Sequence, residues 1–206
     1  MIMASFATSA IGWATRSLFT SDLSMAGRVL DGASELTDGR RSVEWQTFKL
    51  LATQQPVASD LRLAWASMQV AGDLDRMGVL AAHIAKIMVR RHPDPVVPSP
   101  LLDVVLAMAE RAERMAWKLT QVLEVGDPQL SAEVIRADDE MDALERRLFE
   151  VVLTEWSFGV AAAIDATQMG RFYERFADHA VSAAHHVNFL ITGRQRNAGA
   201  ADVNEA

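Results

Sequence analysis

Acidic residues near the carboxyl end of the chain have the spacing of a metal-binding surface. The stretch GRFYERFADHA (170–180) places Glu174 and Asp178 four residues apart, and His185 follows seven residues later. On a helix, which turns by about 100° per residue, these three side chains lie within about 40° of one another. Two carboxylates at this spacing repel each other, and a divalent cation between them would remove the repulsion. The pattern predicts a candidate cation site with two oxygen donors and, at His185, a nitrogen donor.

A second group of acids precedes the first. In VIRADDEMDALE (134–145), Asp138, Asp142 and Glu145 are spaced four and three residues apart, which places them on one face of a helix. If this helix packs antiparallel to the helix of Glu174, the two acidic faces meet along one edge. A solvated helix face has the same pattern, so the residues alone leave both interpretations open.

The later acidic pattern has an incomplete copy earlier in the chain. AGDLDRMGVLA (71–81) aligns with 170–180 at an offset of 99 residues, and Asp75 matches Glu174. Val79 stands where the second acid would be. Asp75 is therefore the candidate ligand of the first half, with Asp73 or His83 as further donors.

The elements that position these residues are predicted to be helices. Four of the six prolines fall in RRHPDPVVPSP (90–100), which divides the chain into 1–92 and 99–193. Helices are expected over about 2–20, 22–54 and 56–91, and then over about 99–125, 127–156 and 160–192. Apolar residues recur three and four apart in two of them (Val70, Leu74, Met77, Ala81, Ile84 and Met88; Met169, Phe172, Phe176, Ala180, Ala183, Val187 and Leu190). We expect an all-α fold of two pseudo-symmetric three-helix bundles, six helices in total, followed by a disordered tail over 194–206.

Composition excludes several classes of protein. The 206 residues carry a net charge of −7 and no basic stripe, which argues against a nucleic-acid partner. Cysteine is absent, and no charged signal peptide or long apolar span precedes residue 22, so we expect a soluble, cytoplasmic protein. P-loop, dinucleotide-binding, zinc-protease and Glu-x-x-His patterns are missing, which favours a protein that is not an enzyme. The tryptophans Trp45, Trp65, Trp117 and Trp156 are expected in the core.

Three stretches together resemble the PhoU family. Residues 50–86, LLATQQPVASDLRLAWASMQVAGDLDRMGVLAAHIAK, resemble its first signature, and residues 170–193, GRFYERFADHAVSAAHHVNFLITG, resemble its second. VIRADDEMDALERRLF (134–149) resembles the helix before the second signature. The resemblance covers roughly residues 22–193 and implies the same two-bundle fold.

The resemblance also implies a function. PhoU proteins are negative regulators of the phosphate-starvation response that connect a phosphate ABC transporter, through its ATPase, to a membrane sensor histidine kinase. They modulate phosphate uptake and meet the membrane only through such partners. In several members the acid motifs bind divalent metal, which here implies iron, manganese, zinc or magnesium. Homodimer formation stays open.

Carried onto this chain, the family motif is complete only in the second half. Glu174, Asp178, Asp138 and Asp142 match the family's acids, whereas in the first half only Asp75 does. Ala33, Thr37 and Val79 occupy the other three positions. We expect metal, if bound, to favour the second half. The alternative functions are a metal-binding bundle or metal-dependent enzyme that uses the second-half carboxylates, and a helical scaffold whose acids only face water.

Overall fold

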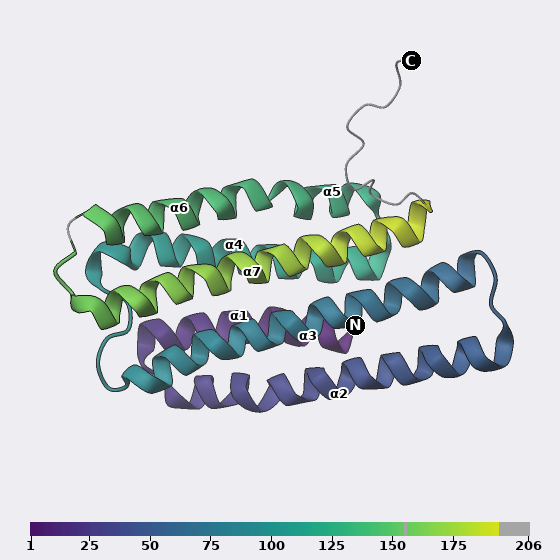
Figure 1. The fold of residues 1–206 in the computed structure, drawn as a ribbon, viewed down its shortest axis with the longest axis horizontal. Coiled ribbons are helices and arrows are strands. Elements are labelled where there is room, and N and C mark those ends of the chain that lie inside the picture. Colours follow the sequence, from purple (N-terminus) through teal and green to yellow (C-terminus); the bar gives the residue numbers. More distant parts are fainter. Residues whose placement is uncertain (155, 194–206) are drawn as a thin grey trace, which may run out of the picture.

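A computed structural model describes residues 1–154 and 156–193, and these residues are almost entirely helical (Figure 1). The helices are α1 (Ile2–Thr20), α2 (Leu23–Gln54), α3 (Ser59–Arg91), α4 (Leu102–Val125), α5 (Pro128–Arg136), α6 (Asp138–Thr154) and α7 (Gly159–Thr192), with a 3-10 turn at Ser99–Leu101. The described ranges contain no strand, so the all-α prediction is confirmed. The predicted disordered tail, 194–206, lies outside the described residues.

The helices form two stacked bundles that run along the same long axis (Figure 1). One bundle contains α1, α2 and α3, and the other contains α4, the consecutive pair α5 and α6, and α7. This confirms two three-helix bundles, with one difference in detail. The helix predicted over 127–156 is interrupted at Ala137, and three acids then begin α6. Acidic side chains in a first turn interact favourably with the exposed N–H groups there, which stabilises a new helix start.

Local sequence accounts for several helix ends. Asp22 caps α2 by accepting from the backbone N–H of Ser24 (2.8 Å). Asp127 caps α5 in the same way through Gln129 (2.8 Å), with Pro128 in the first turn. Glycine at 126 ends α4 with a φ of 70°, a left-handed conformation that residues with a Cβ rarely adopt.

The core lies between α3 and α7, which are the central helices of the two bundles. α3 packs on α1, α2 and α7, and α7 packs on α3, α4, α5 and α6. All six predicted seam residues of α3 are buried, as are most of those of α7. Tyr173, which lies off the predicted seam, is also fully buried, and its hydroxyl shares a 2.8 Å hydrogen bond with Thr15 of α1. α7 is buried on more than one face because it contacts helices of both bundles.

The expectation that the tryptophans lie in the core is wrong for most of them. Trp45 and Trp117 are 66% and 54% exposed, and Trp65 is 39% exposed. Trp45 and Trp117 lie on the outer faces of α2 and α4, so helical spacing, and not residue type, determines their exposure. In the part of the chain described, no helix is both long and apolar enough to cross a membrane.

Candidate cation site

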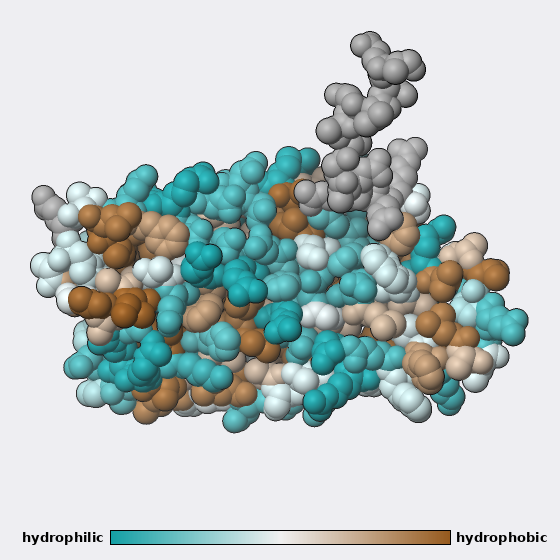
Figure 2. All heavy atoms as spheres, in the orientation of Figure 1, coloured by the Kyte–Doolittle hydropathy of each residue, from teal (hydrophilic) through white to brown (hydrophobic). Residues whose placement is uncertain are grey.

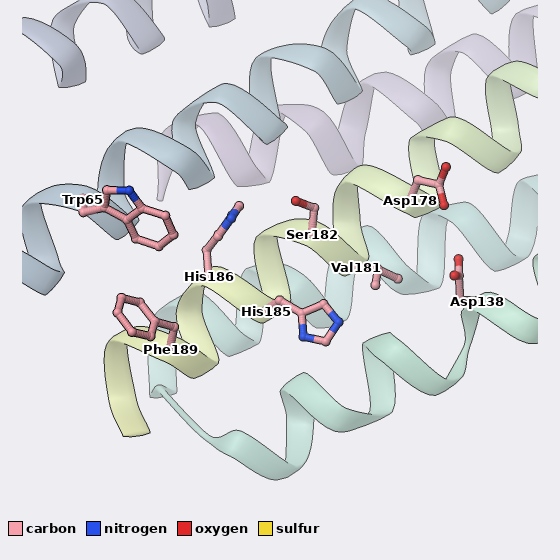
Figure 3. Close-up of a pocket in the computed structure, with 8 residues that line it drawn as sticks. All are labelled: Trp65, Asp138, Asp178, Val181, Ser182, His185, His186 and Phe189. Carbon is pink, nitrogen blue, oxygen red and sulfur yellow. The ribbon is translucent and has the colours of Figure 1, made fainter. Parts of the chain in front are cut away.

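The two acidic faces predicted from the sequence meet between α6 and α7. These helices pack together, and the carboxylate of Asp178 acts electrostatically on Asp138 and on Glu174. Asp142 and Glu145 of α6 also act on Glu174. The side chains of Asp138 and Asp178 extend from neighbouring helices into the same space (Figure 3). Five carboxyl groups from two helices therefore share one surface cluster, hereafter the α6–α7 acidic cluster (Asp138, Asp142, Glu145, Glu174 and Asp178).

Partial burial, together with neighbouring carboxylates, raises the pKa of Asp138, Glu145 and Glu174. Partial burial, followed by the charges of Asp178 and Asp142, raises the pKa of Asp138 to about 6. Partial burial together with the charges of Asp178 and Glu145 raises the pKa of Glu174 to about 7. Burial also raises the pKa of Glu145, although Arg171 opposes the shift. Nearby arginines thus compensate the negative charge of the cluster only in part, which favours either a bound proton or a bound cation.

His185 lies beside the cluster and borders the same cleft. A cleft of about 550 Å³ is lined by Asp138, Asp178, Val181, Ser182, His185 and His186, and by Trp65 and Phe189. The two carboxylates lie at one end of the cleft, the aromatic rings of Trp65 and Phe189 lie at the other, and His185 lies between (Figure 3). The structure thus places His185 in the same cleft as Asp138 and Asp178, from which Val181 partly separates it.

The donor chemistry of the cluster fits a hard divalent cation, although the side chains do not converge on one. Within residues 1–154 and 156–193, no group of three or more His, Asp or Glu side chains is arranged to hold a metal ion. One oxygen, Oε1 of Glu145, is shielded from solvent and has no hydrogen-bond donor. A buried carboxylate oxygen without a donor is costly, and a cation would satisfy it. Carboxylates on two neighbouring helices can be brought onto a cation by rotation of their side chains.

In the first half, an arginine side chain pairs with the acid that corresponds to Glu174. Asp75 is buried in α3, where it accepts hydrogen bonds from Thr37 Oγ1 (2.7 Å) and Arg40 Nε (3.1 Å). Arg40 in turn pairs with Glu44. The guanidinium of Arg40 therefore neutralises the one acid that this half retains, and Asp75 is not part of the α6–α7 acidic cluster.

The other first-half positions surround a hollow that offers little to a cation. Ala33, Thr37 and Val79, together with Leu30, Ser34, Ala82 and Lys86, line a space of about 390 Å³. Its one charged side chain, Lys86, repels a metal ion. The donor residues of the second half therefore fit a divalent cation, and those of the first half do not.

The other candidate donors of the first half face elsewhere. Asp73 is nearly buried against α7, where the Nδ1 atoms of His179 (3.0 Å) and His186 (3.1 Å) hydrogen-bond to its two carboxylate oxygens. His83 packs against the ring of Phe172, 5.0 Å between centroids, and burial lowers its pKa. Neither residue assists Asp75.

Sequence reasoning did not predict the bridge of Asp73 to His179 and His186. The seven-residue spacing of the two histidines places them on one face of α7, and this spacing was the only sign in the sequence that they share a partner. It could not identify the acid, because Asp73 lies more than one hundred residues earlier in the chain.

The chain resembles known proteins in sequence over most of its length. The PhoU domain model matches residues 1–88 and 105–187. The "Phosphate-specific transport system accessory protein PhoU homolog 2" of Mycobacterium tuberculosis is 42% identical over 181 residues, covering 87% of this chain and 85% of that protein. Homolog 1 of the same species is 40% identical over 192 residues, covering 93% and 87%.

Solved structures show the same arrangement of helices. The crystal structure of PhoU from Pseudomonas aeruginosa superposes with a TM-score of 0.85 at 22% identity, covering 94% of this chain and 93% of that one. The phosphate transport system regulatory protein PhoU from Streptococcus pneumoniae gives 0.82 at 21% identity, covering 95% and 92%. With a family model matched in both bundles and relatives at 40–42% identity over most of their length, the chain belongs to the PhoU family.

Proposed function

We propose that this protein is an accessory regulator of a phosphate-specific transport system. The observation that carries the proposal is the 40–42% identity to two proteins described as accessory to such a system, over 85–87% of their lengths. The match extends through both bundles, so it covers the core and the surfaces alike.

In finer terms, the protein represses the phosphate-starvation response from the cytoplasm and modulates phosphate uptake. It acts by contact with the ATPase of a phosphate ABC transporter and with a sensor histidine kinase, and not by catalysis. The elongated shape supports this role, because two stacked bundles present long helix faces to partners (Figure 1). The cleft that α3, α6 and α7 line, with Asp138 and Asp178 at one end, lies on one such face.

A deletion strain tests the regulatory role. Removing the gene, together with any paralogue, should switch on a phosphatase reporter of phosphate starvation in phosphate-rich medium. Complementation with the parent gene should restore repression. Reporter output that stays low in the deletion strain would refute the proposal.

A second candidate function is divalent cation binding at the α6–α7 acidic cluster, supported by the raised pKa values of Asp138 and Glu174. When bound, iron, manganese, zinc or magnesium would supply positive charge, and Glu174, Asp178, Asp138 and Asp142 would hold it, with His185 as a nitrogen donor. A metal-dependent enzyme at this site is the remaining alternative, and substrate turnover by the metal-loaded protein would favour it.

Calorimetric titration with each of these metals tests the site. The double variant Glu174→Gln, Asp178→Asn should lose binding, because it removes two of the carboxylates that share the cation. Asp75→Asn is the matched control and should bind metal like the parent, since the carboxylate of Asp75 already pairs with Arg40. Loss of binding in the Asp75 variant alone would show that the first half holds the metal.

A further inference from the structure

One end of the molecule combines exposed apolar side chains with positive charge. We define the α2–α3 tip as residues 40–65, which comprise the last turns of α2, the connection and the first turns of α3. It lies beyond the amino terminus of α1 along the long axis (Figure 1). Of the 21 large hydrophobic side chains exposed in the described residues, seven belong to this tip: Trp45, Phe48, Leu51, Val57, Leu61, Leu63 and Trp65.

These side chains surround the tip. Trp45 and Phe48 stack on the outer face of α2, with ring centroids 5.8 Å apart, and are 66% and 61% exposed. Val57 is 74% exposed in the connection. On α3, Leu61 and Leu63 are separated by about 200° around the helix axis. A docking face for one protein would be confined to one side, whereas a tip that is apolar on several sides is suited to entering a soft apolar medium.

The charge of the tip is opposite to that of the chain. It carries four basic residues (Arg40, Arg41, Lys49 and Arg62) against two acidic ones (Glu44 and Asp60), a net charge of +2 in a chain of −7. Arg40 is held by Asp75 and Glu44, so the exposed basic side chains of the tip are Arg41 and Lys49. Lys49 lies one turn from Trp45, on the same face of α2. Aromatic rings beside basic side chains are the combination that binds at the interface of an anionic bilayer.

The opposite end of the molecule provides a comparison. Apolar side chains also gather there (Figure 2), at the end where α6 connects to α7. They include Leu153 and Val160, which are 83% and 77% exposed. Residues 148–165, however, contain three acids and no basic residue, and one of the acids, Asp165, pairs with Arg90 and Arg91 of α3. Residues 148–165 and the α2–α3 tip are therefore alike in apolar exposure, but only the tip segment contains more basic than acidic residues.

We propose that the α2–α3 tip docks on the surface of an anionic phospholipid bilayer, with its aromatic and aliphatic side chains among the lipid headgroups. The exposed basic side chains of Arg41 and Lys49 lie against the lipid phosphates, and the acidic remainder of the chain faces away from the bilayer. This inference does not depend on the regulatory role proposed above, because it rests on surface chemistry alone.

Sedimentation with lipid vesicles tests the docking. The full chain should bind vesicles of phosphatidylcholine mixed with phosphatidylglycerol, and bind phosphatidylcholine vesicles much more weakly. The variant Trp45→Ser, Phe48→Ser should lower the partition coefficient about tenfold or more, since it removes two apolar anchors. Lys49→Gln should lower it about fivefold. The matched control Leu153→Ser, Val160→Ser should bind like the parent.

Tryptophan fluorescence locates the tip directly. Lipids brominated near the headgroup should quench the parent protein on binding. Trp45→Phe keeps an apolar ring, so it should still bind but lose much of the quenching, whereas Trp117→Phe on α4 should keep it. Absence of binding to anionic vesicles, equal binding to neutral ones, or equal loss in the Leu153, Val160 control would each overturn the proposal. The first result would indicate a protein partner for the tip.

Discussion

Replacing Glu174 with Gln should stabilise the protein in the absence of metal. The pKa of this carboxyl is about 7 in the folded state and 4.5 in the unfolded state, so above pH 7 its ionisation favours unfolding. If water were fully excluded, this difference would correspond to about 3 kcal/mol. Glu174 is only half-buried, and screening by solvent reduces the expected gain in the free energy of unfolding to about 1 kcal/mol at pH 8.

The pH dependence distinguishes this cause from a general effect of the substitution. Because the raised pKa belongs to an acid, the penalty is absent when both states are protonated and grows as the pH rises from about 4.5 to 7. The gain from Glu174→Gln should therefore shrink to about 0.3 kcal/mol at pH 5.

Urea unfolding at pH 5 and pH 8, with a chelator present, measures both values, and urea avoids the ionic screening that guanidinium introduces. Glu150→Gln, an exposed position on α6, is the control and should change neither. A Glu174 variant that is no more stable at pH 8, or equally stabilised at both pH values, would refute the electrostatic argument.

Two further substitutions test the core and the contact between the bundles. Phe176→Asp should lower the free energy of unfolding by about 4 kcal/mol or more, because Phe176 is fully buried, and the variant should lose the helical signal in circular dichroism. The control Arg175→Asp, at an exposed position, should melt like the parent. Asp73→Asn should cost about 2 kcal/mol in urea unfolding at pH 7. Burial opposes ionisation, but the hydrogen bonds with His179 and His186 hold the pKa of Asp73 below its ordinary value. Its contribution is therefore present above about pH 4 and lost in stronger acid, where variant and parent should converge.

The fold could be predicted from the sequence because its signals are local. Each signal lies within a short stretch of sequence: the prolines in 90–100, the apolar spacing of α3 and α7, and the glycines at 126 and 193. The acidic faces of α6 and α7 were predictable for the same reason, since a spacing of four residues fixes their direction on a helix. The break at Ala137 was not, because alanine favours a continuous helix.

The polar contacts of the first half could not be predicted, because they depend on distant parts of the chain. Asp75 was expected to be a weakened cation ligand, and nothing near it in sequence indicates that Arg40 pairs with it from α2. Asp73 was expected to assist Asp75, yet it contacts α7, more than one hundred residues later. Which face an acid presents is set by sequence, but which partner meets it is set by packing.

The central pairing of α3 with α7 has a mechanical consequence. Two bundles joined only by a linker could swing about it like arms on a hinge. Here the longest helices of both bundles are packed against each other, and Asp165 is clamped by Arg90 and Arg91 while Asp73 is held by two histidines. The proline-rich connection is therefore not the only part of the chain that holds the two bundles together. The two bundles therefore resist bending about the connection, because a bend would have to separate α3 from α7 along their contact.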